Sequence, residues 1–419
     1  MDKIFIKTYG CAHNQADSEF MAGLLSQAKY QITNSIEDSN LVIINTCTVK
    51  DPSEKKFFTQ LERIKKPIVI AGCIPQADKE NPKLKEFSLL GVKQIHRVLE
   101  AVDKTLNGEK IKFLDTKGLT LNLPKIRRNP VVEIVPISNG CLGACTFCKT
   151  KQARGVLDSF PLADIITQIR VSLDEGVKEI WLTSEDLGAY GLDIKSSLPE
   201  LLTQILKIQK DFKLRLGMMN PEYVKKYADQ LIEILKDDRI FKFIHCPVQS
   251  GNNKVLKNMK RKYLIEDYKT SINKLKSAIP NLTVSTDIIC GFPQETDEEF
   301  NDTLELVKEF KFPVLNISKF YPRPNTPAIK MGILPTHIVK ERSLKLTKLK
   351  EKVVSNDSWI DWEGNILVDE FGKEGVLIGR NFAYKHIVVS NSKDKSLLGK
   401  IIKIKIISAT TDYLISETI

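Results

Sequence analysis

The sequence predicts an α/β protein of three parts: an N-terminal parallel α/β domain, a central partial barrel of parallel strands, and a small C-terminal antiparallel β-barrel. Two patterns lead to this prediction. Short runs rich in β-branched residues alternate with helical patterns up to about residue 338, as in parallel sheets. After residue 358 only short β runs remain, separated by turn residues, as in small antiparallel barrels.

The first part spans residues 1–116. Helical patterns there separate three strand candidates, which are Lys3–Thr8, Leu41–Asn45 and Ile68–Ala71. This strand–helix–strand succession favours a parallel sheet. Residues 117–130 follow as a predicted basic linker, because they include Lys125, Arg127 and Arg128.

The central part, residues 131–338, repeats the alternation on a larger scale. Its six strand candidates are Val131–Ile137, Glu179–Thr183, Leu214–Met218, Phe241–Val248, Leu282–Ile289 and Val314–Phe320. The clearest helical pattern is Thr296–Phe310, where Thr296 and Glu299 form a capping box before an apolar stripe. Six strand–helix units predict a partial (βα)6 barrel, since a complete TIM barrel has eight units and roughly 250 residues.

A helical connector over residues 339–357 precedes the last part, residues 358–419. The strand candidates there are Ile366–Phe371, Gly375–Ile378, Lys385–Ser390, Lys400–Ser408 and Asp412–Ser416. Lys403 and Lys405 alternate with isoleucines, so one face of their strand is predicted to be basic and the other buried. Both lysines are candidates for contact with RNA.

The overall composition limits the class of protein. Lys and Arg number 63 against 52 Asp and Glu, a net charge of +11. This surplus is compatible with a polyanionic partner such as RNA, although AT-rich genomes also enrich proteins in lysine. No apolar run approaches the ~20 residues of a membrane helix, and the N-terminus lacks the pattern of a signal peptide. We therefore expect a cytoplasmic protein with no membrane partner.

The chain has eight cysteines, which in a cytoplasmic protein favour metal binding or catalysis over disulfides. Cys246 and Cys290 lie within apolar runs and are predicted to be small buried hydrophobic residues. The other six form two sets of three.

Cys141, Cys145 and Cys148 form a Cys-x3-Cys-x2-Cys motif directly after the first strand of the predicted barrel. Catalytic groups of barrels lie at this end of the strands. Three thiolates so spaced can each bind one iron of a 4Fe–4S cluster and leave the fourth iron open to a ligand. The alternative is a zinc site or a chance cluster, but a zinc site normally has four ligands and no nearby His or Cys supplies the fourth.

Cys11, Cys47 and Cys73 are far apart in sequence, but each follows a strand candidate of the N-terminal sheet. Side chains at the carboxyl ends of parallel strands meet at one edge of the sheet. We expect a second three-thiolate cluster site there, and three isolated buried cysteines are the alternative.

With both triads, the chain resembles the methylthiotransferases, radical-SAM enzymes that insert a methylthio group at an unactivated C–H bond by using S-adenosylmethionine (SAM). The resemblance covers essentially the whole chain: a three-cysteine N-terminal domain, a radical-SAM partial barrel and a C-terminal TRAM barrel. The N-terminal motifs that carry it are Lys7-Thr-Tyr-Gly-Cys11-Ala-His-Asn14, Asn45-Thr-Cys47-Thr-Val49 and Ala71-Gly-Cys73.

Three further motifs are similar to the archaeal and eukaryotic branch of this family: Val135-Pro-Ile-Ser-Asn-Gly-Cys141, Cys148-Lys-Thr-Lys-Gln-Ala-Arg154-Gly155 and Leu214-Arg-Leu-Gly-Met-Met-Asn-Pro221. That branch modifies N6-threonylcarbamoyladenosine at tRNA position 37, just 3′ of the anticodon. The alternatives are a methylthiotransferase acting on isopentenyladenosine in tRNA or on a ribosomal protein, another sulfur-inserting radical enzyme, and a non-catalytic iron–sulfur RNA-binding protein.

The resemblance implies two 4Fe–4S clusters and SAM as cofactors. The cluster on Cys141, Cys145 and Cys148 would cleave SAM to a radical that removes hydrogen from C2 of the adenine. The cluster on Cys11, Cys47 and Cys73 would deliver sulfur, and a second SAM would supply the methyl group. The expected partners are a tRNA anticodon stem-loop, a ferredoxin- or flavodoxin-like electron donor and a sulfur source.

Candidate SAM-binding residues follow the strands of the barrel. Glu185 is a candidate for the SAM ammonium group, with a solvated loop acid as the alternative. Gln249, Ser250 and Asp287 are candidates for the ribose and adenine, although strand-to-loop turns favour such residues anyway. Phe147 is expected to pack near the adenine or in the core.

A threonylcarbamoyl group carries a carboxylate, so its binding site requires a cation. Arg154 and Arg215 are the candidates. The alternative is that both form structural ion pairs, or that Arg154 supports SAM.

Overall fold

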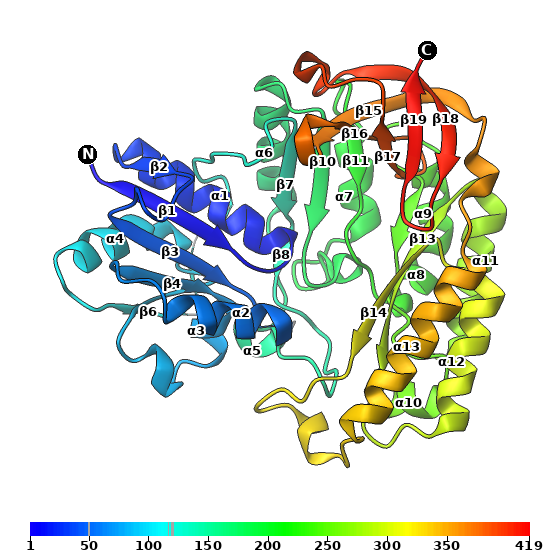
Figure 1. The fold of residues 1–419 in the computed structure, drawn as a ribbon, viewed down its shortest axis with the longest axis horizontal. Helices are drawn as coiled ribbons and strands as arrows, with labels where there is room; N and C mark the ends of the chain where they lie inside the picture. Colours follow the sequence, from blue (N-terminus) through cyan, green and yellow to red (C-terminus); the bar gives the residue numbers. More distant parts are fainter. Residues whose placement is uncertain (49–50, 116, 119–120) are drawn as a thin grey trace.

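The computed structural model describes residues 1–48, 51–115, 117–118 and 121–419. Val49 of one cysteine motif, the expected domain boundary at residue 116 and part of the linker lie outside these residues. Figure 1 shows three parts: an N-terminal sheet, a central set of strands surrounded by helices, and a small barrel at the C-terminus. Within the described ranges, no helix has the length and apolar character that a membrane span requires.

The N-terminal part is a parallel sheet in the strand order β2-β1-β3-β4-β5-β6. The three predicted strands are confirmed as β1 (Lys3–Thr8), β3 (Leu41–Thr46) and β4 (Ile68–Gly72). The sequence analysis missed three short strands, which are β2 (Gln31–Thr33), β5 (Ser88–Gly91) and β6 (Lys112–Phe113). Because β3 and β4 are buried along their whole length, helices cover both faces of the sheet.

The helices of this part begin close to the cysteines. Helix α1 (Ala12–Gln27) starts immediately after Cys11, and α3 (Cys73–Ala77) starts at Cys73 itself. Helices α2 (Asp51–Leu61) and α4 (Val98–Leu106) also belong to this part. The sheet therefore places its strand-to-helix turns, and the cysteines in them, at one edge.

The central part is a partial barrel of parallel strands in the order β7-β10-β11-β12-β13-β14. Two three-stranded sheets compose it, and parallel bridges from Leu214 to Ile240 and from Met218 to His245 join them. The strands are β7 (Val132–Pro136), β10 (Glu179–Thr183), β11 (Lys213–Arg215), β12 (Phe243–His245), β13 (Thr283–Cys290) and β14 (Val314–Lys319). The predicted six-strand barrel is confirmed.

Helices cover the outside of this barrel and enclose its main core. They include α6 (Leu162–Asp174), α7 (Leu198–Ile205), α8 (Pro221–Lys226), α9 (Ala228–Leu235), α11 (Ile265–Ala278) and α12 (Asp297–Phe310). The predicted capping box is present at the start of α12, where Thr296 and Glu299 bond each other's backbone N–H groups. Cys246 and Cys290 are both fully buried in the core, as predicted.

The predicted basic linker packs against the protein itself. Lys125 forms ion pairs with Glu19 at 3.2 Å and with Glu133 at 2.8 Å. Arg127 also pairs with Glu133, and Arg128 is exposed. Two of the three basic side chains are therefore neutralised by carboxylates of α1 and β7.

The C-terminal part is a closed barrel in the order β15-β16-β17-β19-β18, which follows helix α13 (Thr336–Val353). All five predicted strands are present, as β15 (Glu363–Phe371), β16 (Leu377–Arg380), β17 (His386–Val389), β18 (Ile401–Ala409) and β19 (Leu414–Thr418). The expectation of a purely antiparallel barrel needs one correction, since β17 and β19 are parallel. A ring of five strands cannot alternate in direction throughout, so one neighbouring pair must run the same way.

The C-terminal barrel docks on the end of the central barrel where the strands begin. The backbone N–H of Lys242 donates to the carbonyl of Phe382 at 2.7 Å, and the Tyr384 ring packs 4.7 Å from that of Phe241. In Figure 1 the arrowheads of β7, β10 and β11 point away from this barrel. The cysteine motif that follows β7 therefore lies at the opposite end.

Candidate functional site

The three cysteines after β7 each accept a hydrogen bond at sulfur. The backbone N–H of Gly143 donates to Sγ of Cys141 at 3.1 Å, and that of Thr150 to Sγ of Cys148 at 3.4 Å. Nη1 of Arg261 donates to Sγ of Cys145 at 3.2 Å. Three donors directed at three sulfurs stabilise the anionic thiolate form, which is the form that binds metal.

The motif loop leaves space between the sulfurs. A Cβ atom at Gly143 would lie 3.2 Å from Sγ of Cys141 and 3.7 Å from Sγ of Cys145, so a side chain there would enter the loop. Burial, together with the charges of Asp186 and the neighbouring cysteines, raises the pKa of Cys141 to about 12, although the hydrogen bond from Gly143 opposes the shift. Burial also raises the pKa of Cys148, so without a metal these two thiols hold their protons, and an iron cluster would displace them, because coordination favours the thiolate.

Two cysteines of the second set flank Asn14 at the edge of the N-terminal sheet. Sγ of Cys11 lies 3.4 Å from Oδ1 of Asn14, and Nδ2 of Asn14 lies 3.9 Å from Sγ of Cys73. A Cβ atom at Gly10 would lie 2.8 Å from Cβ of Cys47. The ends of β1, β3 and β4 thus bring the three cysteines together.

The charges of neighbouring groups affect the thiol pKa values in this second set. The pKa of Cys73 is raised to about 12, mainly by burial; the charge of Arg154 opposes the shift, while Cys47 and Cys11 add to it. In the described part of the chain, no three His, Cys, Asp or Glu side chains are placed to hold a single metal ion. A cubane cluster needs a wider triangle of sulfurs, because each thiolate binds a different iron.

A buried ion-pair network lies between the two cysteine sets. Nη2 of Arg154, at the end of α5 (Thr150–Arg154), pairs with Oδ2 of Asp17 at 2.7 Å. Its Nε lies 3.1 Å from Oε1 of Glu185, and the same oxygen lies 3.1 Å from Nδ1 of His13. His13 and Asp17 belong to α1, whereas Arg154 and Glu185 belong to the central part. The network therefore fastens the N-terminal domain to the barrel.

The network assigns partners to two candidate residues. Arg154 forms the structural ion pair that the sequence analysis left open as the alternative to substrate binding. Burial would raise the pKa of Glu185, but the charges of His13 and Arg154 hold it below its usual value, so the carboxylate is ionised. Its contact with SAM stays a prediction.

Asp186, next to Glu185, lies on the side of the first cysteine set. It accepts hydrogen bonds from the backbone N–H of Asn220 at 3.0 Å and from Nδ2 at 2.5 Å. Asn220 in turn accepts a hydrogen bond from Arg261, the donor to Cys145. Burial raises the pKa of Asp186 to about 6. These three side chains form a polar chain that ends at the Cys145 sulfur.

Sequence reasoning missed several residues of these sites. His13 and Asn14 are two and three residues after Cys11, and their position close to a candidate ligand was an available signal. Asn220 and Arg261 gave no such signal, because the barrel alone brings Arg261 to a cysteine more than a hundred residues earlier.

The other candidate SAM residues have the following partners in the central part. The Phe147 ring packs edge-on against Phe292 at 6.3 Å, and Oγ of Ser250 lies 3.3 Å from Oγ1 of Thr303 on α12. The backbone N–H of Gln249 donates to the carbonyl of Asp287 at 2.8 Å. The Asp287 carboxylate bonds Nε2 of His245 at 3.0 Å and Nδ2 of Asn316 at 2.8 Å. Roles of these four residues in SAM binding stay predictions.

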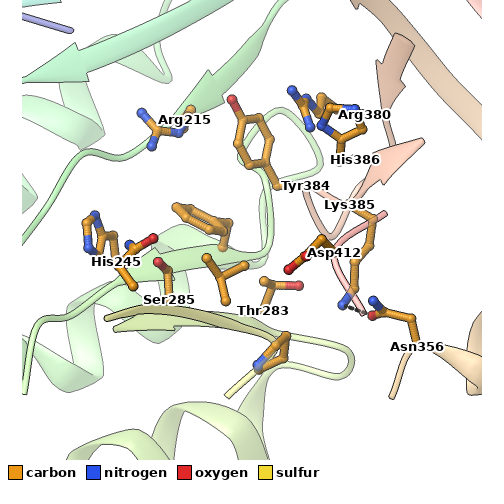
Figure 2. Close-up of a pocket in the computed structure, with 14 residues that line it drawn as sticks. Arg215, His245, Thr283, Ser285, Asn356, Arg380, Tyr384, Lys385, His386 and Asp412 are labelled. Atoms are coloured by element: carbon orange, nitrogen blue, oxygen red, sulfur yellow. Dashed lines mark hydrogen bonds between the residues drawn. The ribbon is translucent and has the colours of Figure 1, made fainter. Parts of the chain in front are cut away.

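The fold does not place Arg215 beside Arg154, the other candidate for the substrate carboxylate. Its guanidinium lies 5.4 Å from the centre of the Tyr384 ring, at the junction with the C-terminal barrel (Figure 2). On that barrel Lys403 is exposed, whereas Lys405 is 3.3 Å from Asp361 and 3.7 Å from Glu363. The structure thus separates the candidate substrate cations into three places.

Comparison with known families agrees with this three-part architecture. Residues 3–90 match the uncharacterized protein family UPF0004, residues 135–307 the Radical SAM superfamily and residues 363–419 the TRAM domain. The fold is similar to that of the radical SAM methyltransferase TsrM from Kitasatospora setae, with a TM-score of 0.56 and 13% identity over 78% of this chain and 75% of that one. Radical SAM domains bind a 4Fe–4S cluster and SAM.

Curated relatives match nearly the whole chain. A threonylcarbamoyladenosine tRNA methylthiotransferase of Xenopus laevis is 43% identical over 98% of this chain and 76% of its own length. The Homo sapiens protein of that name is 42% identical over 99% of this chain and 73% of its own. A probable threonylcarbamoyladenosine tRNA methylthiotransferase of Pyrococcus horikoshii is 37% identical over 100% of both chains. The chain therefore belongs to the threonylcarbamoyladenosine tRNA methylthiotransferase family.

Proposed function

We propose that this protein converts N6-threonylcarbamoyladenosine at tRNA position 37 into its 2-methylthio derivative. The observation that carries the proposal is the pair of cysteine triads on the two sides of one domain interface, fastened by the buried Arg154 network. Full-length similarity to proteins named for this reaction supports the choice of substrate.

Cys141, Cys145 and Cys148 would hold the radical-SAM cluster, which when bound supplies the electron that cleaves SAM. The protein's own contribution is electrostatic. The donors from Gly143, Thr150 and Arg261 stabilise the thiolates and keep the sulfurs in position.

Cys11, Cys47 and Cys73 would hold the auxiliary cluster. Their convergence at one sheet edge fits a three-thiolate site, and Asn14 lies between Cys11 and Cys73. The Nδ2 group of Asn14 also donates to the carbonyl of Thr46 at 3.0 Å, so this side chain ties the strand ends together. Ligands fixed in this way would hold the auxiliary cluster, and the sulfur that it delivers, at a constant position relative to the substrate.

The interface network would set the distance between the two sites. A radical at C2 of adenine must meet a sulfur donor within bonding reach, and holding the reacting groups in one geometry replaces a bimolecular encounter. Arg154 bridges Asp17 on α1 and Glu185 after β10, and all three side chains are almost completely buried. The network would thus keep the two domains in register and exclude water.

The base at position 37 is in a single-stranded loop, so it can enter the site without the melting of a duplex. The C-terminal barrel and the Cys141 triad lie at opposite ends of the central strands, so the tRNA arm would extend along the central barrel. We also propose a cytoplasmic location, a ferredoxin- or flavodoxin-like electron donor, and an external sulfur source for the auxiliary cluster.

The test is nucleoside analysis of tRNA from cells that express or lack the protein. We expect 2-methylthio-N6-threonylcarbamoyladenosine in tRNA to disappear on deletion and to return with the wild-type gene but not with Cys145→Ala. Loss of a methylthiolated isopentenyladenosine instead would favour the runner-up substrate. Unchanged tRNA nucleosides would contradict the proposal.

A further inference from the structure

A cavity of about 260 Å³ lies where the C-terminal barrel meets the first residues of the central strands. From the central barrel Arg215, Phe243 and Thr283 line it, and from the C-terminal barrel Tyr384 and Lys385 do so. Figure 2 shows Arg215 and Lys385 on opposite sides of this space, with Tyr384 between them. None of its lining residues belongs to either cysteine triad or to the Arg154 network, so the proposed reaction leaves the cavity unexplained.

Arg215 presents an unpaired guanidinium to the cavity. It packs against three aromatic rings, at 5.1 Å from Trp181, 5.5 Å from Phe243 and 5.4 Å from Tyr384. Among the described residues no carboxylate lies within ion-pair distance of it, and its Nε is buried without a hydrogen-bond partner. A guanidinium held by ring faces keeps its edge N–H groups available for a planar or tetrahedral oxyanion.

Lys385 faces the same cavity from the C-terminal barrel. Its Nζ donates to Oδ1 of Asn356 at 2.9 Å, and no ion pair is formed with any carboxylate that the structure describes. Burial lowers the pKa of Lys385 to about 8, with no acidic neighbour to oppose the shift. The hydroxyl of Thr283, a further lining residue, is also buried without a hydrogen-bond partner.

Two acidic groups near the cavity already have cations of their own. Asp412, which lines it, pairs with Lys350 at 2.7 Å. Asp369 pairs with Arg380 at 3.2 Å. Two positive charges, on Arg215 and Lys385, are thus left without a negative partner. A half-buried charge without a partner is costly, so an anion in the cavity would be stabilising.

We propose that this cavity is an oxyanion site that binds a phosphate group between Arg215 and Lys385. Arginine bonds phosphate oxygens in pairs and lysine adds a point charge, which is the combination that recurs at phosphate sites. The volume is below the ~300 Å³ at which pockets for whole small molecules begin, so a phosphate fits better than a complete nucleotide. The phosphate belongs either to the backbone of RNA bound on the C-terminal barrel or to a free phosphate ion.

The test measures two ligands on the reconstituted holoenzyme: inorganic phosphate by calorimetry, and an anticodon stem-loop RNA by fluorescence anisotropy. Arg215→Gln and Lys385→Gln should each weaken the ligand that occupies the site by about tenfold or more, since hydrogen bonds to charged groups contribute this much. Lys385→Arg keeps the charge and should retain most of the affinity. Arg170→Gln, which removes an exposed arginine of α6, is the matched control and should change neither.

The outcomes separate the two sources. If inorganic phosphate binds saturably and both Gln variants weaken this binding, the site is assigned to a free phosphate ion. If the protein binds only the RNA, and both Gln variants weaken that binding and reduce its salt dependence by about one counterion, the site is assigned to the RNA backbone. If Arg215→Gln fails to fold, Lys385→Gln carries the test. Affinities for both ligands equal to those of the Arg170→Gln control would overturn the proposal.

Discussion

Nη1 of Arg261 donates a hydrogen bond to the Cys145 sulfur across 3.2 Å. The same guanidinium bonds Oδ1 of Asn220 and lies 5.2 Å from the centre of the Tyr263 ring. Its orientation is therefore fixed by two other side chains, and its positive charge remains directed at one thiolate of the triad. Hydrogen bonds and charges at cluster sulfurs set the reduction potential of iron–sulfur centres.

Arg261→Gln should lower the midpoint potential of the cluster on Cys141, Cys145 and Cys148. Loss of a positive donor disfavours the added electron, and about 1 kcal/mol corresponds to about 40 mV in a one-electron couple. The measurement is an EPR-monitored redox titration in the Cys47→Ala background, in which one cluster gives the signal. Arg170→Gln is the control. A midpoint that does not move would show that the thiolate does not sense the guanidinium.

Iron content tests the assignment of the two triads. Reconstituted wild-type protein should bind about eight irons, as two four-iron clusters require. Cys145→Ala should halve the iron and abolish SAM cleavage, whereas Cys47→Ala should halve the iron and leave reductive SAM cleavage detectable. Cys290→Ala is the matched control, because Cys290 is buried in the core and its charged neighbours are Glu295, Arg342 and Lys319 instead of either triad, and it should keep all the iron. Full iron content in Cys47→Ala would refute the auxiliary site.

The sequence predicted the strands of this protein better than its polar contacts, for a physical reason. The apolar, β-branched composition of runs such as Ile68–Ala71 indicates buried parallel strands. The strand β2 (Gln31–Thr33) is short and partly exposed, so its sequence gives no such indication. The convergence of Cys11 with Cys73 followed from the parallel order of β1, β3 and β4, because topology alone fixes which strand ends meet.

Partners of charged side chains could not be inferred in this way. Arg154 follows the cluster motif in sequence, but its partner Asp17 belongs to another domain, and only the packing of α1 on the barrel brings them together. Arg215 likewise depends on the docking of the C-terminal barrel, which no local pattern records. Contacts between domains are long-range, so residue spacing contains little information about them.

The docking of the C-terminal barrel should depend on pH through Glu179. Burial raises the pKa of Glu179 well above the usual value, and the charge of Asp369 across the interface raises it further, while Arg380 opposes the shift. The pKa of Asp369 is also raised by burial. An acid whose folded-state pKa is raised binds more protons in the folded state than in the unfolded one. Its contribution to stability is therefore complete at low pH and is lost as pH rises above the unfolded value of about 4.3.

Glu179→Gln should remove this dependence, because the amide stays neutral and can still donate to Asp369. Between pH 5 and 8 the free energy of unfolding of the variant should fall less than that of wild type, by at least about 1 kcal/mol, since each pKa unit corresponds to about 1.4 kcal/mol. Urea denaturation at several pH values measures the difference. Glu80→Gln, an exposed control, should follow wild type. Parallel pH profiles for Glu179→Gln and wild type would contradict the assignment.

The two lysines of β18 give a matched pair for tRNA binding. Lys403 is exposed, and no ion pair involving it occurs within the described ranges, whereas Lys405 is held by Asp361 and Glu363. Lys403→Gln should weaken binding of an anticodon stem-loop severalfold and reduce the salt slope by about one, because a free lysine releases a counterion at each phosphate contact. Lys405→Gln should have a smaller effect, since its charge is already neutralised. Equal effects of the two substitutions would show that neither the ion pairs of Lys405 nor the exposure of Lys403 determines which lysine contacts the tRNA.

Substrate discrimination tests the choice of modified base. The threonylcarbamoyl group adds a carboxylate and a urea-like unit that an isopentenyl group lacks, so a site built for it must contain a cation and hydrogen-bond donors. Bound isopentenyladenosine would leave this cation and these donors unpaired, and a site with unpaired buried polar groups strongly rejects the wrong substrate. Turnover on stem-loops carrying threonylcarbamoyladenosine, isopentenyladenosine or adenosine at position 37 should favour the first by at least about a hundredfold in kcat/KM. SAM cleavage without RNA is the control for intact clusters in each preparation. Equal rates on the first two substrates would reject the proposed base and leave the methylthiolation reaction itself standing.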